Sequence, residues 1–376
     1  MNDRWNLIRT AQALLCAIAF VTAAAVPVCR ADEPKPPPTA SRRDPLTDTR
    51  APEFIRYWGT FEQGGVFGAY TSVTIRNGQL EFWHGTMTSD PGKPDDQSRN
   101  VEALAVRRGP SMAELSPDEI VLVMRDVIDD VPRLDGKPGL APKRAFTRTY
   151  VTYDEQVGYV GLVCSHPEYK SHYLHPALIT SKTGKPGDWR YLGMLKGEPA
   201  DEVARRRVWS DGGTILRLPD GRWRIYANGY GDWNGLVVME ADELEGPWKF
   251  LREDGKIKVL TPNIPTAGGQ CLGIFPNVLR VSDTEWHLWI SDRWIPDTIW
   301  HFYSTDGLEW LIYGRQPEII RREQEDYIKC VRSFVAPDGK HIMGLLSVAM
   351  KGGDDSGHTP WVTHWGRLPT GPPPKP

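Results

Sequence analysis

Short apolar segments alternate with tight turns along most of the chain. The clearest example lies at 209–250, where an apolar segment, the turn Asp220-Gly221 and an aromatic segment follow one another. A glycine-rich loop at 228–235 then leads to another apolar segment. Strands of about 5–7 residues joined by Asp-Gly turns are typical of an antiparallel meander. A single meander of this kind leaves a face exposed, so it needs neighbouring copies.

The same order of segments recurs in four other parts of the sequence. Turns comparable to Asp220-Gly221 lie at Asn77-Gly78, Asp154-Glu155, Asp283-Thr284 and Asp338-Gly339. The repeats are spaced by roughly 55–75 residues, which is typical of a repeat architecture that buries one small sheet against the next. We therefore predict an all-β fold, a five-bladed β-propeller of four-stranded antiparallel blades. A pair of β-sandwiches is the alternative, but the shared order of all five repeats favours the propeller.

The last repeat ends near Leu368 with its third strand. We expect an N-terminal segment near 53–58 to supply the missing outer strand and to close the ring.

The N-terminal region has the features of an export signal. Arg4 and Arg9 precede an apolar, alanine-rich segment at 13–28, which is short for a membrane span. Small residues around Ala31 fit cleavage of a signal peptide at 1–31. Lipidation at Cys29 and a retained helix are the alternatives. We expect a secreted or periplasmic protein with no membrane contact after cleavage.

The remaining chain divides by composition. Residues 32–52 are rich in proline and predict a linker, 53–370 hold the repeats, and 371–376 form a proline-rich tail. The net charge of −3 and the lack of a basic stripe argue against nucleic acid as a partner. After cleavage, the cysteines left are Cys164, Cys271 and Cys330. This odd number, without a CxxC motif, argues against a disulfide framework and a structural zinc site.

Three motifs resemble the five-bladed glycoside hydrolases, which include the family 43 arabinanases and xylosidases. These motifs are the Asp-Gly turn in 218–223, the Gly-Pro-Trp corner in 242–248 and the related corner in 304–310. The resemblance covers roughly residues 55–368 and implies carboxylates at the starts of the innermost strands of the first three blades. The equivalent positions here are Gly68-Ala69, Arg144-Ala145 and Ser210-Asp211, of which only Asp211 is a carboxylate. The motif that often holds the acid corresponds to Ile274-Phe275-Pro276, which contains none.

In a propeller, the starts of the inner strands and the loops between the second and third strands surround a central pocket. Asp211 lies at such a start, and Asp232 and Asp292 lie in such loops. Glycoside hydrolysis needs two carboxyl groups, one of which is held protonated. Asp211, Asp232 and Asp292 are therefore our candidate catalytic residues. The other interpretation is a turn or strand cap for Asp211, a turn for Asp232, and a structural salt bridge with Arg293 for Asp292.

Residues that could bind a sugar occur in these loops and on nearby strands. Aromatic rings stack on sugars, and arginine and histidine donate hydrogen bonds to them. The candidates for substrate binding are Tyr230, Trp233, Arg293, Trp294, His166, His175, Arg148 and Arg332.

Metal binding is not favoured by the spacing of these residues. His166, His172 and His175 are not spaced as a helical pair, so we predict no metal ligands, with a histidine metal site as the alternative. We expect no cofactor, with a calcium ion bound by Asp354-Asp355 as the alternative. We interpret Glu325-Asp326 as solvated surface charge.

Two functions from different classes fit these observations. The first is an exported glycoside hydrolase that acts on an oligo- or polysaccharide. The second is a propeller that binds a glycan or another partner without catalysis, which the missing carboxylates favour. A sialidase with Arg148, Arg293 and Arg332 as its arginine cluster is a third, less favoured interpretation. The sequence leaves open whether the protein is an enzyme, with a hydrolase favoured.

Overall fold

The computed structural model describes most of the predicted repeat region. The described residues are 59–62, 71–88, 101–112, 114–123, 149–165, 175–197, 208–229, 235–260, 274–292, 297–314, 317–351 and 361–373. The chain divides into a unit at 1–39 and a unit at 40–376, and all the described residues belong to the second. They form strands and turns, and none of them belongs to a helix that could cross a membrane. The predicted signal peptide at 1–31 and linker at 32–52 lie outside the described residues.

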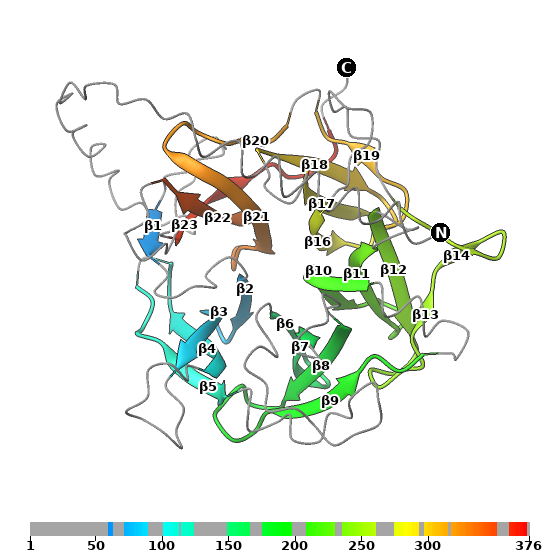
Figure 1. The fold of residues 1–376 in the computed structure, drawn as a ribbon, viewed down its shortest axis with the longest axis horizontal. Helices are drawn as coiled ribbons and strands as arrows, with labels where there is room; N and C mark the ends of the chain where they lie inside the picture. Colours follow the sequence, from blue (N-terminus) through cyan, green and yellow to red (C-terminus); the bar gives the residue numbers. More distant parts are fainter. Residues whose placement is uncertain are drawn as a thin grey trace, which may run out of the picture. The chain divides into compact units, whose positions relative to one another are not determined.

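The strands form the five blades of a propeller ring, which confirms the predicted fold (Figure 1). The innermost strands are β2 (Thr71–Arg76), β6 (Tyr150–Asp154), β10 (Val208–Arg217), β16 (Ile274–Ser282) and β21 (Glu325–Val335). The second strands are β3 (Gln79–Thr88), β7 (Gly158–Ser165), β11 (Trp223–Gly229), β17 (Glu285–Ser291) and β22 (Ile342–Met350). The third strands are β4 (Val101–Gly109), β8 (His175–Ser181), β12 (Gly235–Ala241), β18 (Thr298–Ser304) and β23 (Trp361–Leu368).

The outer strands are shorter and less regular. They are β5 (Glu119–Val123), β9 (Arg190–Met194) and β13 (Lys249–Phe250), and in blade 4 the edge is divided into β19 (Leu311–Ile312) and β20 (Ile319–Ile320). A small hairpin of β14 (Arg252–Glu253) and β15 (Lys256–Ile257) follows blade 3. The segment 116–126, for which the sequence allows a short helix or a strand, contains strand β5.

The ring closes through the first described strand. β1 (Gly59–Glu62) pairs antiparallel with β23, with Gly59 opposite Trp365, and so forms the outer strand of blade 5. The sequence predicted this closure at 53–58, which lies outside the described residues. The closing strand that the structure describes begins at Gly59.

Apolar packing between the blades explains why both faces of many strands are buried. In β11, Ile225 packs into the cluster shared with blade 2, and its neighbour Tyr226 packs into the cluster shared with blade 4. Similar clusters join blade 1 to blade 2, blade 4 to blade 5, and blade 5 to blade 1. Because side chains alternate between the faces of a strand, each strand of the ring supplies two interfaces.

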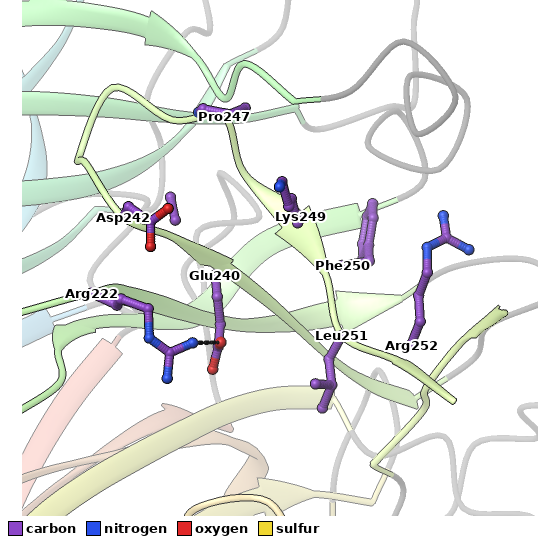
Figure 2. Close-up of a pocket in the computed structure, with 9 residues that line it drawn as sticks. Arg222, Glu240, Asp242, Pro247, Lys249, Phe250, Leu251 and Arg252 are labelled. Carbon is purple, nitrogen blue, oxygen red and sulfur yellow. Dashed lines mark hydrogen bonds and ion pairs between the residues drawn. The ribbon is translucent and has the colours of Figure 1, made fainter. Parts of the chain in front are cut away.

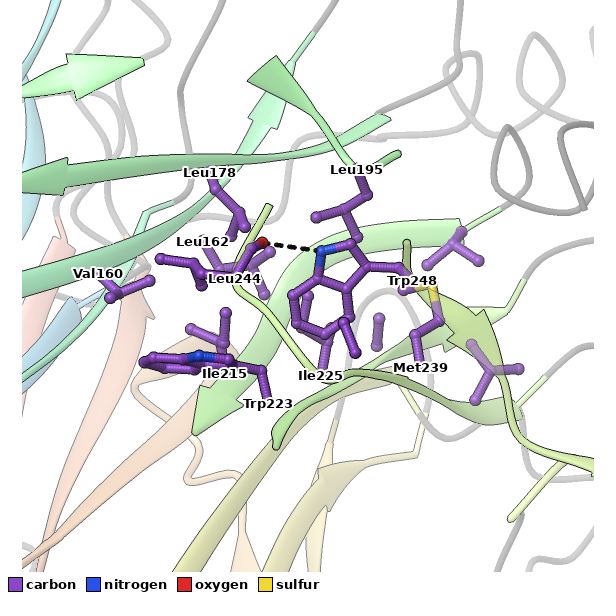
Figure 3. Close-up of a cluster of buried hydrophobic side chains, with 14 of the residues drawn as sticks. Val160, Leu162, Leu178, Leu195, Ile215, Trp223, Ile225, Met239, Leu244 and Trp248 are labelled. Carbon is purple, nitrogen blue, oxygen red and sulfur yellow. Dashed lines mark hydrogen bonds between the residues drawn. The ribbon is translucent and has the colours of Figure 1, made fainter. Parts of the chain in front are cut away.

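The Gly-Pro-Trp corner of blade 3 belongs to one of these interfaces. Trp248 is 1% exposed and donates its indole N–H to the carbonyl oxygen of Leu244 at 3.1 Å. Figure 3 shows its ring between Leu195 and Met239, beside Leu178 of blade 2. The Gly246–Pro247 peptide bond is cis. This corner therefore has a structural role in the interface between blades 2 and 3.

Short polar side chains align the innermost strands. Ser72 in β2 accepts the backbone N–H of Val151 in β6 at 2.8 Å, and Thr214 in β10 accepts that of Val278 in β16 at 3.1 Å. In blade 4, the buried Asn277 accepts both the backbone N–H and the hydroxyl of Ser333 in β21, at 2.8 and 2.6 Å. These hydrogen bonds fix the positions of neighbouring innermost strands relative to each other along the propeller axis.

Candidate functional site

The five innermost strands surround the propeller axis, and each contacts the next around the ring (Figure 1). The start of each one pairs with the end of the second strand of its blade. Examples are Val208 opposite Gly229 in blade 3, and Ile274 opposite Ser291 in blade 4. We call the face of the propeller where the innermost strands begin the entry face. This is the face at which the sequence predicted a central site.

Arg332 of β21 reaches across the axis near this face. Its Nη1 donates to the carbonyl oxygen of Pro276 in blade 4 at 3.4 Å. Its guanidinium carbon lies 5.6 Å from the centroid of the Tyr150 ring in blade 2. Arg332 is 3% exposed, so the positive charge is held inside the ring and in contact with an aromatic face. The sequence predicted Arg332 as a substrate-binding residue, and the structure places it among three blades.

Tyr150 is the first residue of β6 and is half-buried. Burial raises the pKa of its hydroxyl group, and the positive charge of Arg332 opposes this shift. The phenol therefore stays protonated at neutral pH and can donate a hydrogen bond. A guanidinium and a neutral phenol thus stand together at the axis, and both are groups that bind oxygen atoms.

The start of β16 is strained and lies beside a second cation. Phe275 is buried and has a φ of 56°, a left-handed conformation that is rare for a bulky residue. Such a conformation costs about 1–3 kcal/mol and is often found at functional sites. The Lys329 Nζ atom lies 4.3 Å from the centroid of the Phe275 ring. At this position the resemblance implied a motif with an acid, and the structure instead has an aromatic ring and an ammonium group.

Asp211 lies within β10, three residues before Thr214. The sequence suggested that Asp211 precedes the apolar strand, but β10 already begins at Val208. The pairing of β10 with β11 shifts register between Trp209 and Thr214, so Asp211 lies in an irregular part of the innermost strand. Interruptions of strand pairing, such as β-bulges, are common beside active sites.

Asp292 directly follows β17, on the same side of blade 4 as the start of β16. Its backbone N–H donates to the carbonyl oxygen of Thr298 at 3.2 Å, which closes the base of the loop to β18. At the other end of this loop, Asp297 accepts from Nε of Arg321 at 2.6 Å. The charge of Asp297 is therefore paired with that of Arg321.

The remaining predicted site residues are described in part or not at all. His175 begins β8 opposite Ser165, the last residue of β7, so its backbone lies on the entry-face side of blade 2. The other candidates lie outside the described residues: Asp232, Tyr230, Trp233, Arg293, Trp294, His166 and Arg148. Asp354-Asp355 lie outside them as well. Within the described residues, no three histidine, cysteine, aspartate or glutamate side chains are grouped so that they could hold a metal ion.

One prediction for blade 5 was wrong. Glu325 was interpreted as solvated charge, but it is 1% exposed and accepts the backbone N–H of Arg322 at 2.7 Å. A buried carboxylate needs such donors, and this one orders the turn that leads into β21.

A groove of about 270 Å³ lies on the outer side of blade 3 (Figure 2). Arg222 on its wall pairs with Glu240 inside the groove and with Asp220 in the adjacent turn at 2.8 Å. Lys249 and Phe250 of the edge strand form another part of the wall. Because the charge of Arg222 is paired within its own blade, we place the candidate site at the entry face and not in this groove.

Sequence reasoning missed Tyr150 and Lys329. Both lie on innermost strands near the entry face, which is the region that the repeat alignment marked. The family resemblance implies carboxylates there, and an aromatic–cation arrangement gives no signal in a single sequence.

Comparison with known proteins supports the fold. No protein-family model matches the sequence, and no curated protein matches it significantly. Among solved structures, a thermostable family-43 glycoside hydrolase has 14% identity and a TM-score of 0.52, over 84% of this chain and 98% of that chain. A family 117 glycoside hydrolase from the marine bacterium Zobellia galactanivorans has 10% identity and a TM-score of 0.55, over 82% and 87%. An α-L-arabinofuranosidase from Lactobacillus brevis has 12% identity and a TM-score of 0.55, over 82% and 92%.

This chain is thus a five-bladed β-propeller whose fold is similar to that of glycoside hydrolases, at a distance of 10–14% identity. Similarity at this level establishes the fold. The chemistry has to be inferred from the residues of the site.

Proposed function

We propose that this protein is an exported, glycan-active hydrolase whose substrate binds at the propeller axis on the entry face. The observation that carries this proposal is the fold, which is similar to glycoside hydrolases over most of both chains. Export rests on the N-terminal sequence, with its arginines, apolar segment and small residues near Ala31.

In the proposed mechanism, Asp211, Asp232 and Asp292 supply the carboxyl groups. One acts as the acid that protonates the leaving oxygen, and a second acts as the base or nucleophile. Two carboxyl groups about 5–5.5 Å apart would give retention of the anomeric configuration, and about 6.5–9.5 Å apart would give inversion. The position of Asp211 on an innermost strand and of Asp292 at the adjacent blade supports this assignment.

Arg332 and Tyr150 have binding roles in this proposal. The buried guanidinium favours the ionised form of any carboxylate placed near it, because an opposite charge lowers the pKa of an acid. It also donates to sugar hydroxyl groups, as the phenol of Tyr150 does. The predicted aromatic residues Tyr230, Trp233 and Trp294, with Arg293, His166, His175 and Arg148, complete the proposed substrate-binding set.

Glycan binding without catalysis is the second candidate function. It is favoured by one observation, the Phe275–Lys329 pair at the start of β16, where Ile274, Phe275 and Pro276 include no carboxylate.

A hydrolysis screen and a glycan array, both on the purified mature protein, test the proposal. Release of reducing ends from a glycan, followed by assignment of the anomeric configuration of the product by NMR, is the expected result. Binding on the array without hydrolysis of the bound glycan would support the second candidate. The absence of both would contradict a glycan-directed function.

A further inference from the structure

Ser291, the last residue of β17, links the start of the Asp292 loop to the neighbouring blade. Its side chain is 1% exposed, and its hydroxyl group donates to the carbonyl oxygen of Lys329 in β21 at 2.7 Å. Asp292 is the next residue along the chain. The hydrogen bond therefore joins the residue directly before a proposed catalytic carboxylate in blade 4 to the innermost strand of blade 5.

A shift of register in β21 explains why the Lys329 carbonyl group accepts this bond. Ile328 lies opposite Val348 and Cys330 lies opposite Ser347, so the register between β21 and β22 shifts at Lys329. An extra residue at a bulge stands outside the regular ladder, and its backbone groups need other partners. The Lys329 carbonyl group has such a partner in the hydroxyl group of Ser291.

The strand beside Ser291 within blade 4 is irregular as well. Ser291 lies opposite Ile274, and Trp289 lies opposite Asn277, so the register of β16 shifts between Ile274 and Asn277. A regular ladder would fix the end of β17 through its neighbours in the sheet. Because the ladder next to Asp292 is interrupted, the position of Asp292 depends more strongly on the bond from Ser291 to blade 5.

Arg321 holds the base of the same loop at its other end. The backbone N–H of Asp292 donates to the carbonyl oxygen of Thr298 at 3.2 Å, and Asp297 directly precedes Thr298. Arg321 contacts Asp297 twice. Its backbone N–H donates to the carbonyl oxygen of Asp297 at 2.7 Å, and its Nε donates to Oδ1 at 2.6 Å. The base of the loop is therefore attached to the segment that leads from blade 4 to blade 5.

The guanidinium group of Arg321 also reaches blade 5. Its Nη1 donates to the carbonyl oxygen of Glu325, the first residue of β21, at 2.9 Å. A planar guanidinium that donates in two directions at once is held in one orientation. Arg321 thus connects the end of the Asp292 loop to the strand that also receives the bond from Ser291.

Asp292 is in this way attached to β21 on both sides. Ser291 makes the attachment directly before it, and Arg321 makes it through Thr298 and Asp297. β21 also contains Arg332, the cation that the proposed function assigns to substrate binding. Glycoside hydrolysis needs carboxyl groups at a defined separation, and a misplacement of about 1 Å can lower a rate about 10²-fold.

We propose that Ser291 and Arg321 are positioning residues, which hold the Asp292 carboxylate at its working distance from a substrate bound by blade 5. Both residues act through the backbone on either side of Asp292. Their loss should therefore lower the turnover rate and leave substrate binding nearly unchanged. The inference rests on the proposed hydrolase function, in which Asp292 supplies one of the carboxyl groups.

Steady-state kinetics of Ser291→Ala, on a glycan that the wild type hydrolyses, test this role. We expect kcat to fall at least about tenfold while KM stays within about twofold, because the carboxylate moves and the binding groups stay. Ser291→Thr keeps a hydroxyl group and should recover most of the lost kcat. Ser304→Ala is the matched control, since Ser304 is equally buried in blade 4 but caps a turn at the far end of β18. This variant should keep the kcat of the wild type.

Hydrogen exchange of the Asp292 amide measures the attachment without any substrate. The resonance is observed in full-length protein labelled with ¹⁵N-aspartate and is assigned with Asp292→Asn. Exchange should be at least about tenfold faster in Ser291→Ala than in the wild type or Ser304→Ala, because loss of one attachment favours local opening. Arg321→Gln changes a side chain that is 31% exposed, so it keeps the test possible if Ser291→Ala does not fold. It should show the same faster exchange and the same loss of kcat.

Failure of the positioning role can be distinguished from failure of the proposed function. A wild type that hydrolyses no glycan would contradict the hydrolase function, and the positioning role with it. An active wild type whose Ser291→Ala and Arg321→Gln variants keep both kcat and the Asp292 exchange rate would overturn the positioning role alone. A rise in KM without a fall in kcat would also overturn it, because the two residues would then act in binding.

Discussion

The guanidinium carbon of Arg332 in blade 5 lies 5.6 Å from the centre of the Tyr150 ring in blade 2, on the far side of the propeller axis. The same side chain donates to Pro276 of blade 4. One cation therefore connects three blades near the entry face, at the position where the proposed function places a substrate. Its charge and its donors are the features to test first.

Replacing Arg332 by methionine keeps a similar volume but removes the charge and the hydrogen-bond donors. We expect the affinity for the glycan substrate to fall at least about tenfold, because a hydrogen bond from a charged donor contributes about 1.5–3 kcal/mol. Binding is measured by calorimetry and folding by thermal unfolding. Arg280→Met is the matched control, since the Arg280 guanidinium also lies over an aromatic ring, that of Trp286. Equal losses of affinity in both variants would contradict a binding role for Arg332.

Asn277 should contribute more to stability than its hydrogen-bond partner Ser333. Asn277→Ala leaves the buried N–H and hydroxyl groups of Ser333 without their acceptor, which costs about 1–3 kcal/mol in each case. Ser333→Ala removes only the hydroxyl group and should cost about 1 kcal/mol. Urea denaturation of the two variants and of the double variant measures the difference. If Ser333→Ala is as destabilising as Asn277→Ala, the acceptor role of Asn277 is wrong.

The Trp248 corner should be essential for the packing of blade 3 against blade 2. Because its ring is fully buried, Trp248→Ala should lower the free energy of unfolding by about 3–5 kcal/mol. Leu311→Ala provides the control, since that side chain is 64% exposed and its loss should change stability by less than about 0.5 kcal/mol. Similar changes for both would show that the corner does not anchor the interface.

Three titratable groups of blade 4, Glu318, His287 and His301, predict a stability maximum close to pH 6.5, the ordinary pKa of histidine. The pKa of Glu318 is raised from 4.5 to about 7 on folding, so its contribution is complete below 4.5 and is lost as pH rises toward 7. The pKa values of His287 and His301 are lowered, so their contribution is complete above 6.5 and is lost as pH falls below it.

Glu318→Gln isolates one side of this profile. Relative to the wild type, it should gain stability as pH rises from 4.5 to about 7, by at most about 3 kcal/mol at 1.36 kcal/mol for each pKa unit. Chemical denaturation at several pH values measures the gain. A constant difference between the two proteins across this range would show that Glu318 does not titrate as described.

The sequence predicts the fold well because repeated turn chemistry is a local signal. Asp220-Gly221 and its counterparts mark the first turn of each blade, and the structure confirms the predicted strands around them. The closing strand is described from Gly59 onward and is defined by its pairing with β23, while the predicted segment at 53–58 lies outside the described residues. The start of β10 was placed too late, because Val208 and Trp209 already pair with β11 and a polar, glycine-rich segment separates them from Thr214.

The site is harder to predict from the sequence because it is built across blades. Arg332 was recognised as a single residue, but its contacts with Tyr150 and Pro276 depend on three blades meeting at the axis. The unusual φ of Phe275 also has no signature in the sequence, since bulky residues rarely adopt it. The contact between His287 and His301 was missed because the two lie on different strands and each looks like a packed strand residue.

Hydrolysis of a glycan by the Asp211→Asn and Asp292→Asn variants tests the proposed function most directly. We expect each variant to fold like the wild type and to lose activity by about 10²–10⁴-fold, the usual contribution of acid–base catalysis. Asp220→Asn, which changes an exposed turn aspartate of blade 3, should keep full activity. Full activity in both the Asp211→Asn and Asp292→Asn proteins would contradict catalysis by these carboxylates at the entry face.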